Sequence, residues 1–417
     1  MTLFEEILLP ANLHLAWQRV KRNKGSAGYD GISIDDYLSW SKAHWGNIKR
    51  GLHAGNYCPQ PVKRIEIPKP NGGVRLLGIP CVNDRVIQQA IMQHLQALID
   101  PTFSDHSYGF RPKRSAQHAV KAVQQQIKAK RRYAVDIDLS KFFDQVDHDL
   151  LMHRLSLRIN DRQVLALIGK YLRAGISNKG KVEPSRRGVP QGSPLSPLLA
   201  NIMLDDLDRY LEAKNYPFAR YADDFVISVS SPQEGQRVMD DVKRFLSTLK
   251  LPINEEKSQI VPTSTLCFLG YQFKGRYLTW SKKSLNRFKH NIRQLTSRTW
   301  GVSWHKRYHA LRQYLQGWMN YFSLSTYDPV IQLDHWIRRR IRMCYLKQWR
   351  KPRTRIRNLI KLGVSVKIAV TLGISPKGYY RLAKTKAVQW GLSNQHLKSQ
   401  GLVSLKDQWI ASRYPNG

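Results

Sequence analysis

Alternating hydrophobic and polar residues predict a β-hairpin in the first quarter of the chain. Residues 62–68 and 74–79 both alternate, and Pro-Asn-Gly-Gly between them is typical of a tight turn. Apolar residues at helical spacing predict helices around this hairpin, over 10–20, from Asp35 onward, over 84–99 and over 115–130. The glycine-rich, basic stretch 21–31 is expected to be a loop.

In the middle of the chain, two strand patterns carry carboxylates near their ends. The strand predicted over 133–139 places Asp136 and Asp138 on one face, because side chains two residues apart share a face. Strands predicted over 218–220 and 225–227 flank a turn that holds Asp223 and Asp224. Helices are expected over 149–157, 162–172 and 198–213, the last of them after a rigid proline- and glycine-rich loop over 188–197. This alternation of strands and helices favours an α+β domain with a mostly antiparallel sheet.

After residue 274 the pattern becomes that of basic helices rich in tryptophan and arginine. Apolar stripes over 304–322 and 333–345 are expected to pack into a core. The opposite faces carry a dense series of cations, namely Arg338, Arg339, Arg340, Arg342, Lys347, Arg350, Lys351, Arg353, Arg355 and Arg357. No acidic series offsets them, so we expect them to neutralise phosphates rather than to pair within the chain.

Composition indicates a polyanionic partner. The 417 residues, enough for two or three domains, include 68 Lys+Arg against 30 Asp+Glu, a net charge of +38. Nucleic acid is favoured over a membrane surface because 11 Trp, 19 Tyr and 12 Phe also offer faces for stacking on bases, and no apolar stretch is long enough to span a bilayer. The four cysteines form no C-x-x-C pair, and a reducing, cytoplasmic location is expected.

The paired carboxylates point to a cation. Two ionised carboxylates a few ångströms apart are tolerated only with a positive charge beside them, and Mg²⁺ prefers such oxygen ligands. An isolated Asp-Asp pair is most often ordinary turn chemistry, and Asp136 is read as a solvated strand residue. A third carboxylate, Asp138, favours a metal site over ordinary turn chemistry for Asp223 and Asp224, because three such groups suit a two-metal phosphoryl-transfer centre. Lys69 and Arg75 flank the first hairpin turn and could reach a shared anion, although in isolation solvated hairpin charges would be the better explanation.

The ordered motifs resemble those of a reverse transcriptase, and within that superfamily they are similar to group II intron-encoded reverse transcriptases and maturases. The palm motifs that carry the resemblance are Asp138-x4-Phe143, Pro190-Gln191-Gly192, Tyr221-Ala222-Asp223-Asp224, Asn254-Glu255-Glu256-Lys257 and Phe268-Leu269-Gly270-Tyr271. Further matches lie at 68–75, 108–112, 191–197, 315–322, 336–340 and 347–352. Each motif alone is weak, and the ordered set is specific.

The resemblance implies a right-hand polymerase fold, in which fingers and an antiparallel palm sheet with helices are followed by an α-helical thumb or maturase domain. Its domains would be 1–130 for the N-terminal extension and fingers, 131–275 for the palm, 281–358 for the thumb or maturase domain, and 359–417 for a short basic DNA-binding tail. No paired cysteines and histidines follow Gly363, so we do not expect this chain to cut a second DNA strand.

The resemblance also implies roles for individual residues. Asp138, Asp223 and Asp224 would be catalytic and would hold two Mg²⁺ ions, with Leu139 at the same metal site. Lys69, Arg75, Phe143 and Gln191 would bind the deoxynucleoside triphosphate, where the Phe143 ring would collide with a 2′-hydroxyl. Lys257 would be a candidate proton donor to pyrophosphate. Template or RNA contacts would fall to Asn23, Lys24, Arg111, Arg338, Arg339, Arg340, Lys351 and Arg353.

The implied partners are the parent group II intron RNA, an RNA template, and a DNA primer or target, with nucleoid association when the protein is on DNA. The oligomeric state is left open, a dimer included. Two alternatives stand beside an active polymerase and maturase. One is a non-catalytic RNA-binding splicing factor, and the other is a reverse transcriptase of a retron, a diversity-generating element or a defence system.

Overall fold

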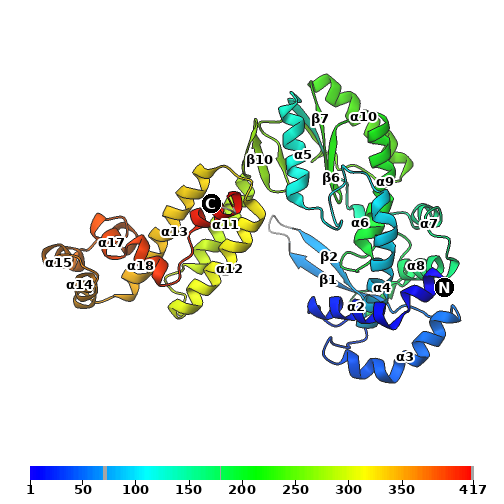
Figure 1. The fold of residues 1–417 in the computed structure, drawn as a ribbon, viewed down its shortest axis with the longest axis horizontal. Helices are drawn as coiled ribbons and strands as arrows, with labels where there is room; N and C mark the ends of the chain where they lie inside the picture. Colours follow the sequence, from blue (N-terminus) through cyan, green and yellow to red (C-terminus); the bar gives the residue numbers. More distant parts are fainter. Residues whose placement is uncertain (69–72, 179, 415–417) are drawn as a thin grey trace. The chain divides into compact units, whose positions relative to one another are not determined.

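The structure is a computed structural model that describes residues 1–68, 73–178 and 180–414. The chain divides into two compact units, Met1–Thr263 (unit 1) and Ser264–Gly417 (unit 2). Figure 1 shows that unit 1 combines sheets with helices, whereas unit 2 is mainly helical. None of the described helices is both long enough and apolar enough to cross a membrane.

Unit 1 contains most of the strands and a single large core. Its helices are α1 (Leu3–Ile7), α2 (Pro10–Arg22), α3 (Tyr37–His53), α4 (Val82–Ile99), α5 (Ala116–Lys128), α6 (Phe142–Gln145), α7 (His148–Ser156), α8 (Arg162–Arg173), α9 (Ser196–Ala213) and α10 (Pro232–Thr248), with a short 3₁₀ turn at Asp100–Thr102. One cluster of buried apolar side chains runs from Phe4 to Leu251. The predicted division between fingers and palm therefore does not separate two cores.

The central sheet of unit 1 is antiparallel, as the sequence predicts. Its strands lie in the order β6 (Phe218–Tyr221), β7 (Asp224–Val229), β3 (Tyr133–Ile137) and β8 (Gln259–Pro262). Helix α5 packs against β6 and β7, and α10 packs against β3 and β8. Because β3 lies between β7 and β8, the end of β3 comes beside the hairpin formed by β6 and β7.

The second sheet of unit 1 has the order β2 (Val74–Ile79), β1 (Val62–Pro68), β4 (Ile176–Asn178) and β5 (Lys181–Glu183). The predicted β1–β2 hairpin is confirmed, with Ile67 opposite Arg75. The β4–β5 hairpin is an addition, and β4 pairs with β1 in the parallel direction. These strands of three residues are too short to show an alternating pattern in the sequence.

Unit 2 begins with a small sheet and continues as packed helices. Its sheet has the order β11 (Tyr277–Trp280), β10 (Tyr271–Lys274) and β9 (Cys267–Phe268). Its helices are α11 (Lys282–Leu295), α12 (Trp304–Phe322), α13 (Tyr327–Gln348), α14 (Pro352–Lys361), α15 (Val366–Ile374), α16 (Tyr379–Leu382), α17 (Lys386–Gly391), α18 (Asn394–Ser399) and α19 (Leu405–Arg413). The two predicted apolar stripes are buried on α12 and α13, for example at Leu311, Leu315, Ile337 and Ile341.

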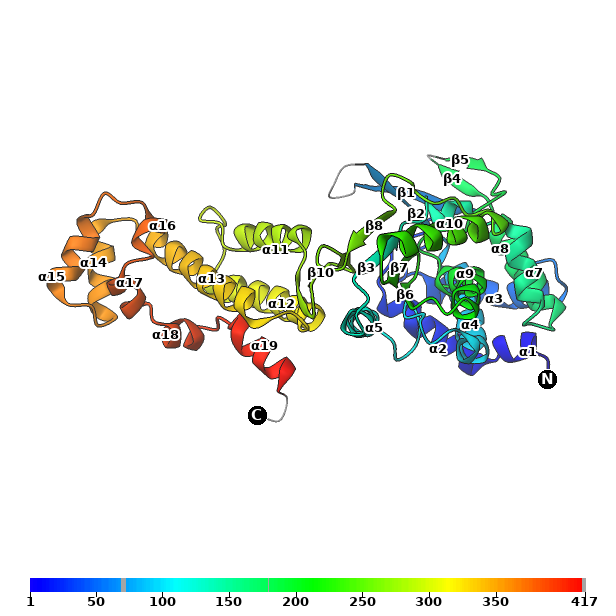
Figure 2. The same ribbon diagram turned by 90° about the horizontal axis from the view of Figure 1, so that it is seen from above.

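Residues 359–417 do not form the separate tail that the sequence suggests. Figure 2 shows α14–α17 at one end of α13, from which α18 and α19 lead back along it. Arg342 Nε on α13 donates to the Leu392 carbonyl at 2.8 Å, and the Leu405 amide donates to the Asp334 carboxylate at 2.9 Å. Trp409 Nε1 donates to the Ser325 carbonyl at 2.9 Å. These buried or half-buried bonds join the segment to the rest of unit 2, and the unit boundary at Thr263 also falls before the predicted palm end at 275.

Candidate active site

The two adjacent carboxylates lie at the turn between β6 and β7. Tyr221 pairs with Asp224, which leaves Ala222 and Asp223 at the tip of a two-residue hairpin turn. Ala222 has φ = +59°, in the left-handed region that such a turn requires and that residues other than glycine adopt at a cost. The surrounding structure must therefore hold this turn in place.

A buried arginine, Arg220, holds the turn between β6 and β7. The side chains of Arg220 and Asp208 are both 0% exposed and form an ion pair, with Arg220 Nε donating to Asp208 Oδ1 at 2.7 Å. Arg220 Nη1 donates to the Ala222 carbonyl at 3.0 Å and to Asn201 Oδ1 at 3.1 Å. Its Nη2 donates to Ser107 Oγ at 2.9 Å. The guanidinium thus ties the backbone of the turn to helix α9 and to the segment before α5.

Gly109 packs against the backbone of the same turn. A Cβ at residue 109 would stand 2.3 Å from the Ala222 nitrogen and 2.9 Å from the Tyr221 carbonyl carbon, closer than real Cβ atoms approach. Asn201 Nδ2 donates to the Gly109 carbonyl at 2.8 Å, so the residue that receives Arg220 also holds Gly109. Backbone packing against backbone therefore positions Asp223.

Asp138 comes directly after β3, as the strand pattern predicts. Ile137 pairs with Phe225 in antiparallel register, so the next position along β3 lies opposite Asp224. The Asp138 backbone is held on its other side, where the Asn254 amide donates to its carbonyl at 2.8 Å and its own amide donates to Ser258 Oγ at 3.1 Å. Lys257 Nζ lies 3.1 Å from Asp138 Oδ2, which makes this lysine a counterion of the predicted metal site.

The carboxylates influence one another. Desolvation by the surrounding protein raises the pKa of Asp224 to about 6, and the charges of Asp223 and Asp138 add to this effect. Desolvation likewise raises the pKa of Asp223 and, to about 6, that of Asp136, with Asp138 contributing to both. Asp136 is half-buried rather than fully solvated, in contrast to the sequence expectation. Excess negative charge in this region favours a bound cation.

The donor set suits a hard divalent cation, although the carboxylates do not converge on one point. Carboxylate oxygens are the ligands that Mg²⁺ prefers, and its remaining positions are usually filled by water and substrate phosphate. Across the described residues, no group of three or more His, Cys, Asp or Glu side chains lies close enough to hold a metal ion. Asp138, Asp223 and Asp224 would thus hold the metal together with oxygens that come from outside the chain.

Of the predicted nucleotide-binding residues, Arg75 influences Asp223 directly, and the loop of Gln191 packs on the same strand as Arg75. The Gly78 amide on β2 donates to the Gln191 carbonyl at 2.7 Å, which docks the 188–197 loop on the strand that carries Arg75. The charge of Arg75 lowers the pKa of Asp223 against the stronger opposing effect of desolvation. Phe143 lies half-buried on α6, and its carbonyl accepts from the Val189 amide at 2.7 Å. Lys69 lies outside the described residues.

The predicted RNA contacts divide into exposed and internal side chains. Asn23, Lys24, Lys351 and Arg353 are exposed and stay predictions. Arg111 is instead a structural residue, because it is 8% exposed and donates to the Asp100 carboxylate at 2.9 Å and to the Ser107 carbonyl at 3.0 Å. A guanidinium enclosed in this way is not free to bind a template.

The arginine series on α13 is also used inside the protein. Arg338 pairs with Asp334 at 2.7 Å, and Arg339 donates to the Tyr380 carbonyl while its guanidinium lies 3.7 Å from the Tyr380 ring centroid. Arg340 Nη2 donates to the Thr296 carbonyl. Arg338 is therefore paired within the chain, in contrast to the expectation, whereas Arg339 and Arg340 donate to uncharged acceptors, and the RNA contacts of all three stay a prediction.

The buried network around Arg220 is the part of the site that sequence reasoning missed. Two signals could have revealed it. Arg220 is a charged residue directly before the acidic turn in a strand that otherwise reads as apolar, and Asp208 lies on a helix of mainly apolar pattern. A charge at a buried position needs a partner, so the two could have been matched.

Comparisons with known proteins agree with this arrangement. A family model described as reverse transcriptase (RNA-dependent DNA polymerase) matches residues 67–273, and one described as group II intron, maturase-specific domain, matches residues 285–363. Protein YkfC of Escherichia coli (strain K12) is 33% identical over 285 residues, which are 59% of this chain and 75% of YkfC.

Intron-encoded proteins are similar over comparable lengths. Group II intron-encoded protein LtrA of Lactococcus lactis subsp. cremoris is 31% identical over 349 residues, or 68% of this chain and 58% of LtrA. The COX1/OXI3 intron 1 protein of Saccharomyces cerevisiae is 29% identical over 316 residues, or 62% of this chain and 38% of that protein. The chain thus spans somewhat more than half of LtrA and a smaller part of the yeast protein.

These matches identify the chain as a member of the reverse transcriptase family. Within that family it belongs with the proteins that carry a group II intron maturase domain. Dependence on a divalent metal is general to the reverse transcriptase domain, and the carboxylate donors at the β6–β7 turn suit it.

We predict that Gly109→Ala displaces the acidic turn. The new Cβ would require the Tyr221–Ala222 peptide to shift, which should lower the free energy of unfolding by about 1–3 kcal/mol and polymerase activity about 10-fold or more. Thermal unfolding and primer extension measure the two effects. Gly46→Ala is the matched control, since a Cβ there meets no atom within 4 Å and Gly46 lies inside α3, where alanine is favoured by about 0.5–1 kcal/mol. Wild-type activity in Gly109→Ala would contradict this account of the turn.

Proposed function

We propose that the protein is an RNA-directed DNA polymerase with two Mg²⁺ ions in its active site, and that it also acts as a maturase on its parent group II intron RNA. The observation that carries the polymerase proposal is the position of Asp138, directly after β3, opposite Asp224 on β7 and near Arg75 of the β1–β2 hairpin. Two metals between acidic side chains suit the in-line displacement of pyrophosphate from a nucleotide.

Each residue of the site has a defined task in this proposal. Asp138, Asp223 and Asp224 hold the metal ions, with Leu139 beside them on the chain. When bound, the ions supply activation of the primer 3′-hydroxyl and neutralise the charge of the departing pyrophosphate. Arg75 and Lys69 bind the triphosphate of a deoxynucleotide, and Gln191 contacts the nucleotide beside the nascent base pair. Lys257, whose Nζ lies 3.1 Å from Asp138 Oδ2, would be the proton donor to pyrophosphate.

The maturase part of the proposal assigns intron RNA to the basic surfaces of both units. Structured RNA is recognised through shape and backbone contacts, which exposed cations such as Lys24, Lys351 and Arg353 can make. Binding of the intron would promote its splicing, and reverse transcription primed at a cut DNA target would insert it. We place these steps in the cytoplasm, at the nucleoid when target DNA is bound. A non-catalytic splicing factor would not need the carboxylates, because like charges without a metal only destabilise the fold.

Asp223→Asn should separate the two activities. The amide keeps the shape of the side chain and removes a charge that the metal needs, so DNA synthesis on an RNA template should fall by a factor of about 100 or more. Splicing of the intron RNA by the same variant should persist, because the basic surfaces are unchanged. Asp240→Asn, an exposed position on α10, is the control and should leave both activities unchanged. Undiminished primer extension by Asp223→Asn, or by wild-type protein in excess chelator, would refute the polymerase proposal.

Phe143→Ala should relax the choice of sugar. If the ring excludes a 2′-hydroxyl, removing it should raise the relative efficiency of ribonucleotide incorporation about 10-fold or more, with deoxynucleotide incorporation largely retained. Phe143 lies half-buried at the surface of the core, so Phe143→Leu serves as a variant that preserves packing. Single-nucleotide primer extension with matched ribo- and deoxynucleotides measures the ratio. An unchanged ratio in both variants would remove Phe143 from sugar selection.

A further inference from the structure

Two adjoining cavities lie along α13 in unit 2, within a part of the protein that the polymerase site does not use. The first has a volume of about 360 Å³ and the second about 380 Å³. They share His335, Arg338 and Asn394, so a single crevice runs between α13 and the segment that contains α17 and α18. Both volumes fall in the range of small-ligand sites.

The second cavity is strongly cationic. Among the described residues that line it are Arg338, Arg339, Arg342 and Lys384, and none of them is acidic. Arg342 is 5% exposed, and its guanidinium donates to the Leu392 carbonyl and to Asn394 Oδ1 rather than to a carboxylate. Burial and the charge of Arg338 lower the pKa of Arg342 to about 10. Arg342 is thus a buried charge with no acidic partner among the described residues, and an anion in the cavity would relieve the cost of burying it.

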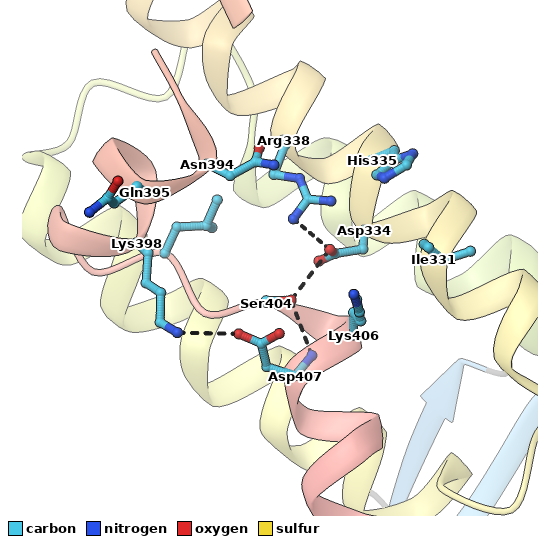
Figure 3. Close-up of a pocket in the computed structure, with 11 residues that line it drawn as sticks. Ile331, Asp334, His335, Arg338, Asn394, Gln395, Lys398, Ser404, Lys406 and Asp407 are labelled. Atoms are coloured by element: carbon cyan, nitrogen blue, oxygen red, sulfur yellow. Dashed lines mark hydrogen bonds and ion pairs between the residues drawn. The ribbon is translucent and has the colours of Figure 1, made fainter. Parts of the chain in front are cut away.

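The first cavity is polar but nearly balanced in charge. In Figure 3, the Arg338 guanidinium points to Asp334, whose carboxylate also accepts from Ser404. Lys398 reaches Asp407 across the opening at 3.5 Å. Gln395 from α18 offers a further amide. This lining combines hydrogen-bond donors and acceptors with apolar surface that includes Ile331 and Leu402, which is the character of a pocket for a base and its sugar rather than for a second phosphate.

We propose that the crevice binds one unpaired nucleotide of an RNA, with its phosphate beside Arg338, Arg342 and Lys384 and its base in the neighbouring cavity. Arginine and lysine together suit a phosphodiester, and Arg338 stands where the two parts of the nucleotide would meet. The proposal rests on the RNA partner of the proposed function and adds to it a defined contact at a single nucleotide.

RNA is the occupant that the observations favour. Sequence-specific recognition of RNA targets loops, bulges and ends whose bases can be extruded, and a crevice of this size admits one extruded base but no duplex. Helix α13 also lies within residues 285–363, the region that matches the maturase-specific domain. A DNA strand offers the same phosphate, so DNA is an outcome that the test must distinguish.

Lys384→Ala in the full-length protein tests the phosphate contact. Lys384 is exposed, so its removal should not unfold the protein, and no hydrogen bond or ion pair of its ammonium appears among the described residues. With a short single-stranded oligouridine RNA as probe, loss of one phosphate contact should weaken binding and reduce the steepness of log K against log salt by about 0.7. Lys384→Arg should restore both.

Lys386→Ala is the matched control. Lys386 is exposed two residues further on, in α17, and lines neither cavity, so its substitution should leave the salt slope unchanged. Equal effects of Lys384→Ala and Lys386→Ala would mean diffuse attraction and would overturn the proposal. Binding of the deoxyuridine oligomer with the same affinity and the same dependence on Lys384 would overturn the assignment to RNA.

A second measurement locates the base. A probe that carries one 4-thiouridine should cross-link on irradiation to the peptides that contain Gln395 or Ser404, and Lys384→Ala should reduce this cross-link. Cross-linking only elsewhere in the chain would refute the crevice as the site. Primer extension by the wild-type protein measures the polymerase separately, so a failure of this proposal is distinguishable from a failure of the polymerase assignment.

Discussion

The ion pair between Arg220 and Asp208 is the interaction on which the geometry of the acidic turn depends. Both side chains are fully buried, so each has lost its hydration and neither can be removed alone without leaving an uncompensated charge in the core. Such pairs add little net stability compared with apolar replacements, and the contacts of Arg220 with the turn show what this pair does instead, which is to position the turn. Arg220 has five N–H donors in a rigid plane, and these reach Asp208, Asn201, Ser107 and the Ala222 carbonyl at once. A lysine could not span the same set.

The charge within the site explains why so rigid a support is needed. Asp138 and Asp224 lie on neighbouring strands and Asp223 lies at the adjoining turn, so their mutual repulsion acts to spread them apart. The turn itself is strained at Ala222. Hydrogen bonds from Arg220 and close packing against Gly109 offset both effects in the absence of a cation. The charges of Lys257 and Arg75 reduce the repulsion further.

The sequence predicts the local elements of the site better than the buried residues that hold these elements in place. Alternation located the strands that carry Asp138 and Asp224, and Pro-Asn-Gly-Gly located the first hairpin, because each pattern depends on neighbouring residues alone. Strands β4 and β5 are each three residues long, which is too short to show alternation in the sequence. Composition cannot distinguish the exposed Arg353 from the buried Arg342, because both belong to one basic series. Arg342 is buried because residues 359–417 pack against α13, and the sequence pattern does not reveal this packing.

The burial of some arginines in the basic series of unit 2 does not remove the attraction of their positive charges for phosphates. Many arginines of unit 2 donate to backbone carbonyls, as Arg307 does to Leu295 and Arg340 to Thr296 at the end of α11. Cations are favoured at a helix C-terminus because the carbonyls there carry partial negative charge. A carbonyl satisfies the donors of a guanidinium but brings no full negative charge, so the positive field of the unit persists. The same arginines can therefore hold the helices together and still attract phosphates, which reconciles their internal hydrogen bonds with a chain whose net charge is +38.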